Sequence, residues 1–445
     1  MRHTTITAFL ALCTLAWCDE PEAKSAIVDL QVSDYAALGS AVPHLVEHGG
    51  QLYSIWRGHA EKQTKQIDGL PVIPAELMRG SWKPGWNTVA YASRLDGGTW
   101  SNAARLADGD VKCDPVFVWS DTRGLNLLVE LGDSTCSHLL LSGEQKRWEE
   151  IRHFPELKEG IFVPLGIQQI GDSLHVTTFS QKQLCYWRYS GRDWHGPTVI
   201  EKDVKFDGTY GYFRPRLAVA DSGEVHVIWN TQADPSHVVI RDDKIVSTRY
   251  IQLTPRASKG DDIDIEALKD GRLILAYHVA EGELDPKAAI YICRFSKGKW
   301  EEPSAGPPGG GVVFGNPQLV AHNGQALLVW VHQAEIRSGA SGTTASFSIQ
   351  DHEGAWTEPT IIKPISTDPI ADNGGRPTFY SLYCTRDGSV HMTWGDDSVF
   401  VMNLSRIGAR PTKVEQDGTG QPATRPESKS EGGDKPLPEA EGRSR

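Results

Sequence analysis

A turn glycine followed six residues later by a large residue that closes an apolar run is the feature that most limits how this chain can fold. The run ends in an aromatic residue five times and in Glu or Thr twice, and its copies lie mostly about fifty residues apart. Internal repeats of this length are typical of solenoids, propellers and arrays. The copies are Gly50–Trp56, Gly124–Glu130, Gly171–Thr177, Gly223–Trp229, Gly271–Tyr277, Gly324–Trp330 and Gly388–Trp394.

Each copy follows a short extended run that often opens with Pro, as at Pro215 and Pro377. An apolar run, a polar turn with Gly and a second apolar run predict a β-hairpin. A later turn carries a tryptophan, which we expect to turn a third strand into a fourth and to pack between neighbouring units. Each unit is then a blade of about four antiparallel strands. These tryptophans are Trp100, Trp148, Trp194, Trp300 and Trp356.

Seven copies predict an all-β fold, a seven-bladed β-propeller with four-stranded antiparallel blades. A ring of six or eight blades remains the alternative. The last copy has only three predicted strands, whereas the segment Ala26–Val32 stands alone before the first blade. We expect this segment to supply the missing strand, which closes the ring and leaves no open sheet edge.

The two ends of the chain differ from the repeat. Arg2, His3 and an apolar run up to Trp17 predict a signal peptide over residues 1–25, although a buried helix would share the pattern. Export makes the protein secreted or periplasmic, and lipidation at Cys18 stays open. We place the propeller at 26–407. The Gly-, Pro-, Ser-, Glu- and Lys-rich residues 408–445 are expected to be disordered.

Composition excludes several classes. The net charge of −12 gives no basic bias toward nucleic acid or anionic membranes, and no interior run is long and apolar enough to span a bilayer. No Cys-x-x-Cys spacing or other metal pattern occurs, so no metal and no cofactor is expected. Cys113 and Cys136 border the channel face of one blade, which predicts a disulfide between them in an exported protein. Cys185, Cys293 and Cys384 are expected to be free and buried.

The turn with the tryptophan resembles the Asp-box (BNR) repeat of sialidases and related propellers. The two best copies begin at Ser93 and Ser348 and end at Trp100 and Trp356. The segment Tyr212-Phe213-Arg214-Pro215 is similar to the Phe/Tyr-Arg-Ile-Pro motif of sialidases, without the Ile. The resemblance implies a sialidase-like propeller, in which the Asp-boxes themselves are structural.

Sialidases hold the carboxylate of a sugar acid with three arginines, and this chain offers a similar set. A guanidinium fits a carboxylate through two parallel hydrogen bonds and stays charged. Loops that lead into first strands and loops that leave second strands share one face of a propeller and surround its channel. The predicted substrate-binding residues on this face are Arg57, Arg214, Arg376, His59 and His332.

The same face offers candidates for acid–base chemistry. Asp262 is chosen as the acid or base from the acidic run Asp261-Asp262-Ile263-Asp264, and His278 and Tyr212 complete the predicted catalytic set. Further polar and ionisable residues expected on this face include His44, Asp114, Arg216, Asp264, Asn230, Asn316, Gln333 and Asp396. A long insertion between Arg57 and Trp86 is expected to overhang the channel.

Three functions fit these residues. The first is a glycoside hydrolase acting on an acidic, extracellular or cell-surface glycan. The second is a polysaccharide lyase, in which Arg214 would neutralise a uronate carboxylate and Tyr212 or His278 would take the C5 proton. The third is a non-catalytic carbohydrate-binding or scaffold propeller, since a fold alone does not determine function.

Overall fold

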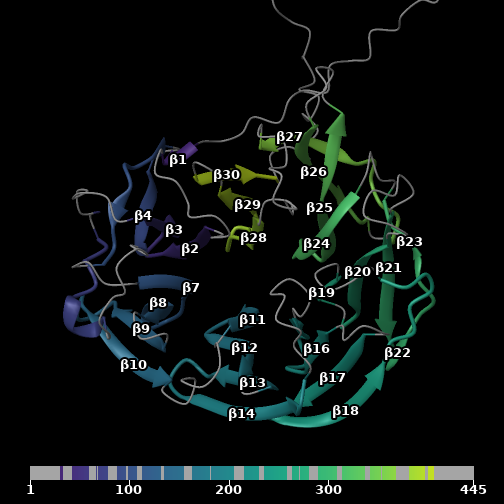
Figure 1. Ribbon diagram of the computed structural model, residues 1–445, viewed down its shortest axis with the longest axis horizontal. Helices are drawn as coiled ribbons and strands as arrows, with labels where there is room; N and C mark the ends of the chain where they lie inside the picture. Colours follow the sequence, from purple (N-terminus) through teal and green to yellow (C-terminus); the bar gives the residue numbers. More distant parts are fainter. Residues whose placement is uncertain are drawn as a thin grey trace, which may run out of the picture. The chain divides into compact units, whose positions relative to one another are not determined.

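Seven antiparallel sheets follow one another around a ring, so the predicted seven-bladed β-propeller is confirmed (Figure 1). Colour runs from purple to yellow around the ring, and the last blade lies beside the first. Among the described residues no helix is long and apolar enough to cross a membrane. The computed structural model describes residues 31–33, 43–59, 67, 69–78, 88–96, 99–107, 113–131, 135–154, 163–180, 182–204, 215–229, 235–257, 263–269, 271–279, 289–307, 313–335, 341–351, 353–366, 380–395 and 399–404.

In every blade the chain begins at the channel and moves outward strand by strand. The innermost strands are β2 (His44–His48), β7 (Cys113–Ser120), β11 (Val163–Ile170), β15 (Arg216–Val219), β19 (Ile263–Ala267), β24 (Val313–His322) and β28 (Tyr380–Cys384). The second strands, which carry the repeated apolar run, are β3 (Gln51–His59), β8 (Gly124–Leu131), β12 (Ser173–Ser180), β16 (Val225–Trp229), β20 (Leu273–Val279), β25 (Gln325–Glu335) and β29 (Val390–Gly395).

The third and fourth strands form the outside of the ring. The third strands are β4 (Thr88–Asp96), β9 (Cys136–Ser142), β13 (Gln183–Tyr189), β17 (Ser236–Arg241), β21 (Ala289–Ser296), β26 (Ser341–Ile349) and β30 (Val399–Asn403). The fourth are β10 (Trp148–Phe154), β14 (Trp194–Glu201), β18 (Lys244–Tyr250) and β27 (Thr360–Ser366). In blades one and five the fourth strand is split into β5 (Thr99–Trp100) with β6 (Ala104–Arg105), and β22 (Lys299–Trp300) with β23 (Ser304–Ala305).

The ring is closed by the N-terminal strand, as predicted. β1 (Gln31–Ser33) pairs antiparallel with β30 through Gln31 opposite Phe400 and Ser33 opposite Val399. The strand therefore covers only the end of the predicted segment, and residues 26–30 lie outside the described part of the chain. The predicted signal peptide and the predicted tail lie outside it as well.

The core lies between the blades. The aromatic residues that close the repeat are at most 3% exposed, and they pack against neighbouring blades. The turn glycine is needed because the chain there adopts positive φ, +81° at Gly223, which residues with a Cβ rarely adopt. The aromatic residues are Trp56, Trp229, Tyr277, Trp330 and Trp394.

Two turn tryptophans bond the preceding blade through a histidine. Trp194 Nε1 donates to His138 Nδ1, and Trp300 Nε1 donates to His237 Nδ1, each at 3.1 Å. Because an indole only donates, each Nδ1 is an acceptor and the proton of the neutral ring lies on Nε2. His237 then donates from Nε2 to His226 Nδ1 at 3.0 Å. Burial lowers the pKa of His138 and of His237 to about 3, so both rings are neutral.

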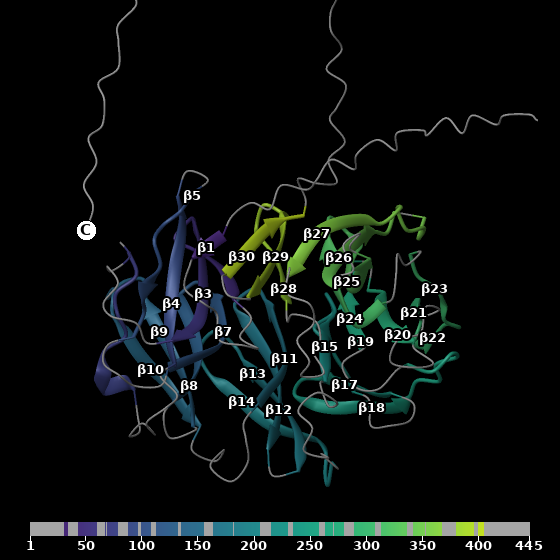
Figure 2. The same ribbon diagram turned by 45° about the horizontal axis from the view of Figure 1, so that its top comes forward.

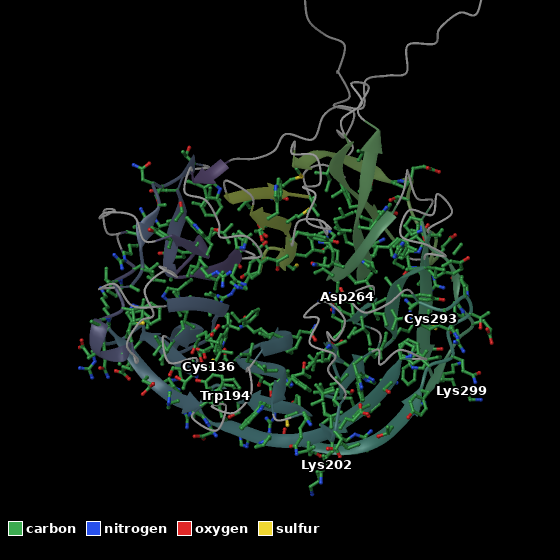
Figure 3. The ribbon with its side chains drawn as sticks, viewed as in Figure 1. Cys136, Trp194, Lys202, Asp264, Cys293 and Lys299 are labelled. Atoms are coloured by element: carbon green, nitrogen blue, oxygen red, sulfur yellow. The ribbon has the colours of Figure 1, made fainter. Side chains whose placement is uncertain are left out.

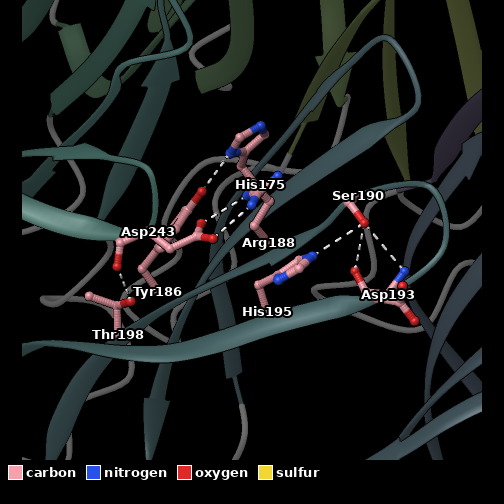
Figure 4. Close-up of polar contacts among 8 residues, drawn as sticks. All are labelled: His175, Tyr186, Arg188, Ser190, Asp193, His195, Thr198 and Asp243. Carbon is pink, nitrogen blue, oxygen red and sulfur yellow. Dashed lines mark hydrogen bonds and ion pairs between the residues drawn. The ribbon is translucent and has the colours of Figure 1, made fainter.

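Arginines join successive blades on the outside of the ring. Arg188 of β13 forms two hydrogen bonds with Asp243 in the β17–β18 turn, at 2.8 and 2.7 Å (Figure 4). Arg249 donates to Gly298 O at 2.6 Å, and Arg294 donates to Gly354 O at 3.2 Å. Each of these arginines reaches the turn between the third and fourth strands of the next blade.

The two turns that resemble Asp-boxes share one hydrogen-bond pattern. Ser93 Oγ donates to Ser101 O at 2.6 Å, and Ser348 Oγ donates to Thr357 O at 2.7 Å. Cys293 takes the same place in blade five, where its Sγ donates to Glu301 O at 2.9 Å. In each of these blades the hydrogen bond fastens the turn to the following strand.

The described part of the insertion packs between blades one and two, so the expectation that it overhangs the channel is wrong for residues 67 and 69–78. Ile67, Leu70, Ile73 and Met78 are buried in the cluster that these two blades share. Ile73 N donates to Leu106 O at 2.7 Å. The segment includes the short 3-10 helix Ala75–Leu77. Burial of its apolar side chains accounts for this placement.

The predicted disulfide is also wrong, because Cys136 is a free, buried thiol. Cys113 begins β7 and Cys136 begins β9, and β8 lies between the two strands. Two strand spacings put the backbones about 9–10 Å apart, beyond the reach of a disulfide. Cys185 and Cys293 are free and buried as predicted, and Cys384 is free and partly buried.

Candidate functional site

The blades follow one another around the ring, as the ribbon turned by 45° also shows (Figure 2). The seven innermost strands surround a cavity of about 830 Å³. Described residues of every innermost strand line it. Fold and cavity together define the class of this protein, a seven-bladed β-propeller with a central channel.

Polar contacts join each innermost strand to the next, so the channel wall is continuous around the ring. Three of the seven junctions use a glutamine or aspartate side chain against the backbone of the next blade. Two others use the Tyr383 hydroxyl and the His48 ring. The seven contacts are His48–Ser120, Gln169–Ser120, Gln168–Val219, Arg216–Ile263, Asp264–Leu319, Gln318–Tyr380 and Tyr383–Glu47.

Two carboxyl groups of β19 lie in this wall. The strand reads Ile263-Asp264-Ile265-Glu266, and both isoleucines are buried in the contact with blade four. Alternation along a strand therefore places Asp264 and Glu266 on the opposite face, and both line the cavity. Figure 3 labels Asp264 on the inner side of the ring.

Asp264 has partners that favour its charged form. Its Oδ2 accepts a hydrogen bond from Leu319 N at 2.7 Å, and its Oδ1 lies 3.7 Å from Arg216 Nε. Arg216 Nε in turn donates to Ile263 O at 3.1 Å, which holds the guanidinium beside the carboxyl. Burial raises the pKa of Asp264, while the Arg216 charge and the backbone N–H groups oppose that shift.

Glu266 is surrounded differently. Its side-chain contact is with Gln168 of β11, whose Nε2 donates to Glu266 Oε1 at 3.4 Å. Burial, with the negative charge of Asp264 as the second cause, raises the pKa of Glu266 to about 8. At neutral pH the proton of the pair is therefore held by Glu266. The described residues contain no group of three or more metal-ligating side chains.

Half of the eight predicted catalytic and substrate-binding residues lie outside the described part of the chain. This holds for Asp262, Tyr212, Arg214 and Arg376, which stay predictions. His59 ends β3 and His332 lies in β25, where the structure describes the backbone only.

Arg57 and His278 are described in full. Arg57 is partly buried in β3, opposite Ala90 of β4. His278 is 4% exposed, and alternation in β20 puts it on the same face as Ala276, which packs against blade six. His278 therefore lies on the side of blade five that faces blade six, and its catalytic role stays a prediction.

Sequence reasoning missed Glu266. The acidic run from which Asp262 is chosen ends at Asp264, two residues before Glu266. The available signal was the alternation of acidic residues with isoleucine from Asp262 to Glu266, which is the period of a strand with one polar face.

Comparison with known proteins gives a likeness of fold. No protein-family model matches the sequence, and none of the curated proteins matches it. Among solved structures, a prolyl endopeptidase is 9% identical, with 84% of this chain and 51% of that chain covered and a TM-score of 0.43. This chain thus spans about half the length of that endopeptidase.

Two further structures come from different enzyme classes. A putative 6-phosphogluconolactonase from Bacteroides uniformis is 14% identical, with coverage of 73% and 93% and a TM-score of 0.42. An α-L-arabinanase from Penicillium chrysogenum, complexed with arabinobiose, is 10% identical, with coverage of 76% and 97% and a TM-score of 0.37. None of these likenesses indicates what this chain acts on.

Proposed function

We propose that this protein is an exported, sialidase-like glycoside hydrolase in which Glu266 is the general acid and Asp264 the general base. The observation that carries the proposal is the unequal environment of two neighbouring channel carboxyls. Asp264 lies beside a guanidinium, whereas Glu266, partly buried in the channel wall, lies next to a like charge and has a pKa of about 8. Burial raises the pKa of Asp264 as well, but the Arg216 charge and a backbone N–H favour its ionised form. Two carboxyl groups in different environments are the usual basis of acid and base roles.

The chemistry follows from their spacing. Residues two apart on a strand are about 7 Å apart, within the range of about 6.5–9.5 Å that leaves room for a water in inverting glycosidases. Glu266 gives its proton to the glycosidic oxygen as the bond from that oxygen to the anomeric carbon breaks. Asp264 takes a proton from the water whose oxygen bonds to that carbon. The products are a hydroxyl and a sugar of inverted configuration, and solvent exchange restores both carboxyls.

The proposed substrate is an acidic extracellular or cell-surface glycan. Its carboxylate would be held at the mouth of the channel by Arg57, Arg214 and Arg376, with His59 and His332 nearby. This part rests on the resemblance to sialidases and on the residue types in the loops.

A non-catalytic glycan-binding propeller is the second candidate. The observation that favours it is that both carboxyls also join blades, Asp264 through Leu319 and Glu266 through Gln168. Carboxyl groups with such contacts stabilise the channel wall whether or not they also take part in catalysis.

The test is incubation with a panel of acidic and neutral glycans. Release of reducing ends by the wild type, lost in Glu266→Gln, supports the hydrolase. The matched control is Glu201→Gln, the same change at a carboxylate on outer strand β14 that accepts a bond from Trp229 Nε1 at 2.7 Å. Absorbance of unsaturated uronates would instead indicate a lyase, and glycan retention without turnover would indicate the binding propeller.

A further inference from the structure

We propose that Gln168 is a positioning residue for Glu266, which holds one carboxyl oxygen at the blade wall so that the other carries the proton into the channel. This inference rests on the proposed function, in which Glu266 is the general acid.

The orientation of the Gln168 amide is decided by a backbone group. Val219 N, of β15, donates to Gln168 Oε1 at 2.7 Å. A backbone N–H can only donate, so the amide oxygen must face Val219 and the NH₂ group must face the other way. Gln168 Nε2 is thereby directed at Glu266 Oε1.

This contact separates the two oxygens of Glu266. An NH₂ group that donates to Oε1 disfavours a proton on that oxygen, because two hydrogens would face each other. The proton is then on Oε2. The contact is long, 3.4 Å, whereas Val219 holds the amide at 2.7 Å, so the amide is anchored firmly and the carboxyl only loosely. A general acid that gives up its proton and is then reprotonated requires a contact that orients it without binding it tightly.

The other ionisable groups around Glu266 do not supply this orientation. Asp264, on the same strand, adds a negative charge that retains the proton on Glu266. On β28, burial raises the pKa of the Cys384 thiol, so at neutral pH this neighbour is uncharged. Arg216 of β15 acts on Asp264, 3.7 Å away.

The adjacent glutamine gives a matched control. Gln169 also reaches a neighbouring blade, in this case the preceding one, where its Nε2 donates to Ser120 O at 2.7 Å; it also donates to Gly171 O at 2.8 Å. Gln168→Met and Gln169→Met each remove one interblade amide from β11, whereas only the first removes the donor to Glu266.

The experiment measures stability against pH for the wild type and both variants, and kcat and KM wherever the wild type cleaves a glycan. Loss of the donor should move the alkaline end of the Glu266 titration up by about half to one pH unit in Gln168→Met, the equivalent of one hydrogen bond. Gln169→Met should leave it in place. In an active enzyme Gln168→Met should also lower kcat with little change in KM.

A second variant covers the case in which Gln168→Met fails to fold. Gln168→Glu keeps an acceptor for Val219 N and puts a second carboxyl beside Glu266, which raises the pKa of the pair. If the titration is unmoved in whichever variant folds, the inference is overturned. If the titration moves but the wild type cleaves no glycan, the proposed function fails and the pairing of Gln168 with Glu266 stands.

Discussion

Replacing Glu266 by Gln should stabilise this protein at neutral pH and leave its stability unchanged in mild acid. The ordinary pKa of glutamate is 4.5 and that of Glu266 in the folded chain is about 8. The folded state thus binds the proton more tightly than the unfolded state. The stability linked to this group is fully present below pH 4.5 and is lost as pH rises toward 8.

The magnitude follows from the same shift. Between pH 4.5 and 7 the wild type loses about 1.36 kcal/mol per pH unit through this group, or about 3 kcal/mol in total. This is an upper limit, since the side chain lines a cavity and is partly exposed. A glutamine has the same shape and no charge to desolvate, so the variant should be about 1–3 kcal/mol more stable than the wild type at pH 7.

Urea unfolding of wild type and Glu266→Gln at pH 4.5, 6 and 8 tests this, with Glu201→Gln as the control. The difference between wild type and Glu266→Gln should grow with pH, and at pH 8 it should exceed the difference seen for Glu201→Gln. Equal midpoints at all three pH values, or a variant that is less stable at pH 8, would refute the reasoning. Glu266 would then be ionised in the folded chain and could not be the acid.

Three further predictions concern the contacts between blades. Burial lowers the pKa of His237 in the folded chain to about 3, so the stability linked to this ring is present above its ordinary pKa of 6.5 and is lost as pH falls. His237→Gln should therefore flatten the decline of the urea midpoint between pH 6.5 and 4. Asp243→Asn should cost about 1 kcal/mol at pH 7, because Arg188 lowers the pKa of this part-exposed carboxyl, and the difference should vanish below the folded pKa. Cys293→Ser should retain the wild-type melting temperature, because serine fills the equivalent place in blades one and six, whereas Cys293→Val, which cannot donate to Glu301 O, should cost about 1 kcal/mol.

The blade count was predictable because each blade repeats a local pattern. The pattern of a glycine at positive φ with an aromatic residue six positions later lies within one hairpin. The tryptophan of the next turn marks where the blade contacts the preceding one. Closure by the N-terminal strand followed from counting strands, since one was missing at the end. These features need no knowledge of how distant blades meet.

The predicted disulfide is wrong because of the strand order within a single blade. Cys113 and Cys136 were correctly assigned to the starts of a first and a third strand. That assignment already places β8 between them, and the spacing of strands in a sheet forbids the bond. The strand order predicted from the sequence therefore already argues against this disulfide.

The alternation of acidic residues with isoleucine could place Glu266 on the polar face of a strand, but its protonation could not be predicted from the sequence because it depends on a partner in another blade. Gln168 and Glu266 are 98 positions apart, and they meet only because the ring brings β11 and β19 to the same channel. The environments of Asp264 and Glu266 differ for the same reason, because the partners of Asp264 are Arg216 from blade four and Leu319 from blade six. A propeller that ties its blades together with polar side chains at the channel thereby also sets the charge of the groups exposed there. The contacts that close the ring and those that would prepare it for catalysis are the same contacts, so a change at Gln168 or Glu266 should be felt in both stability and turnover.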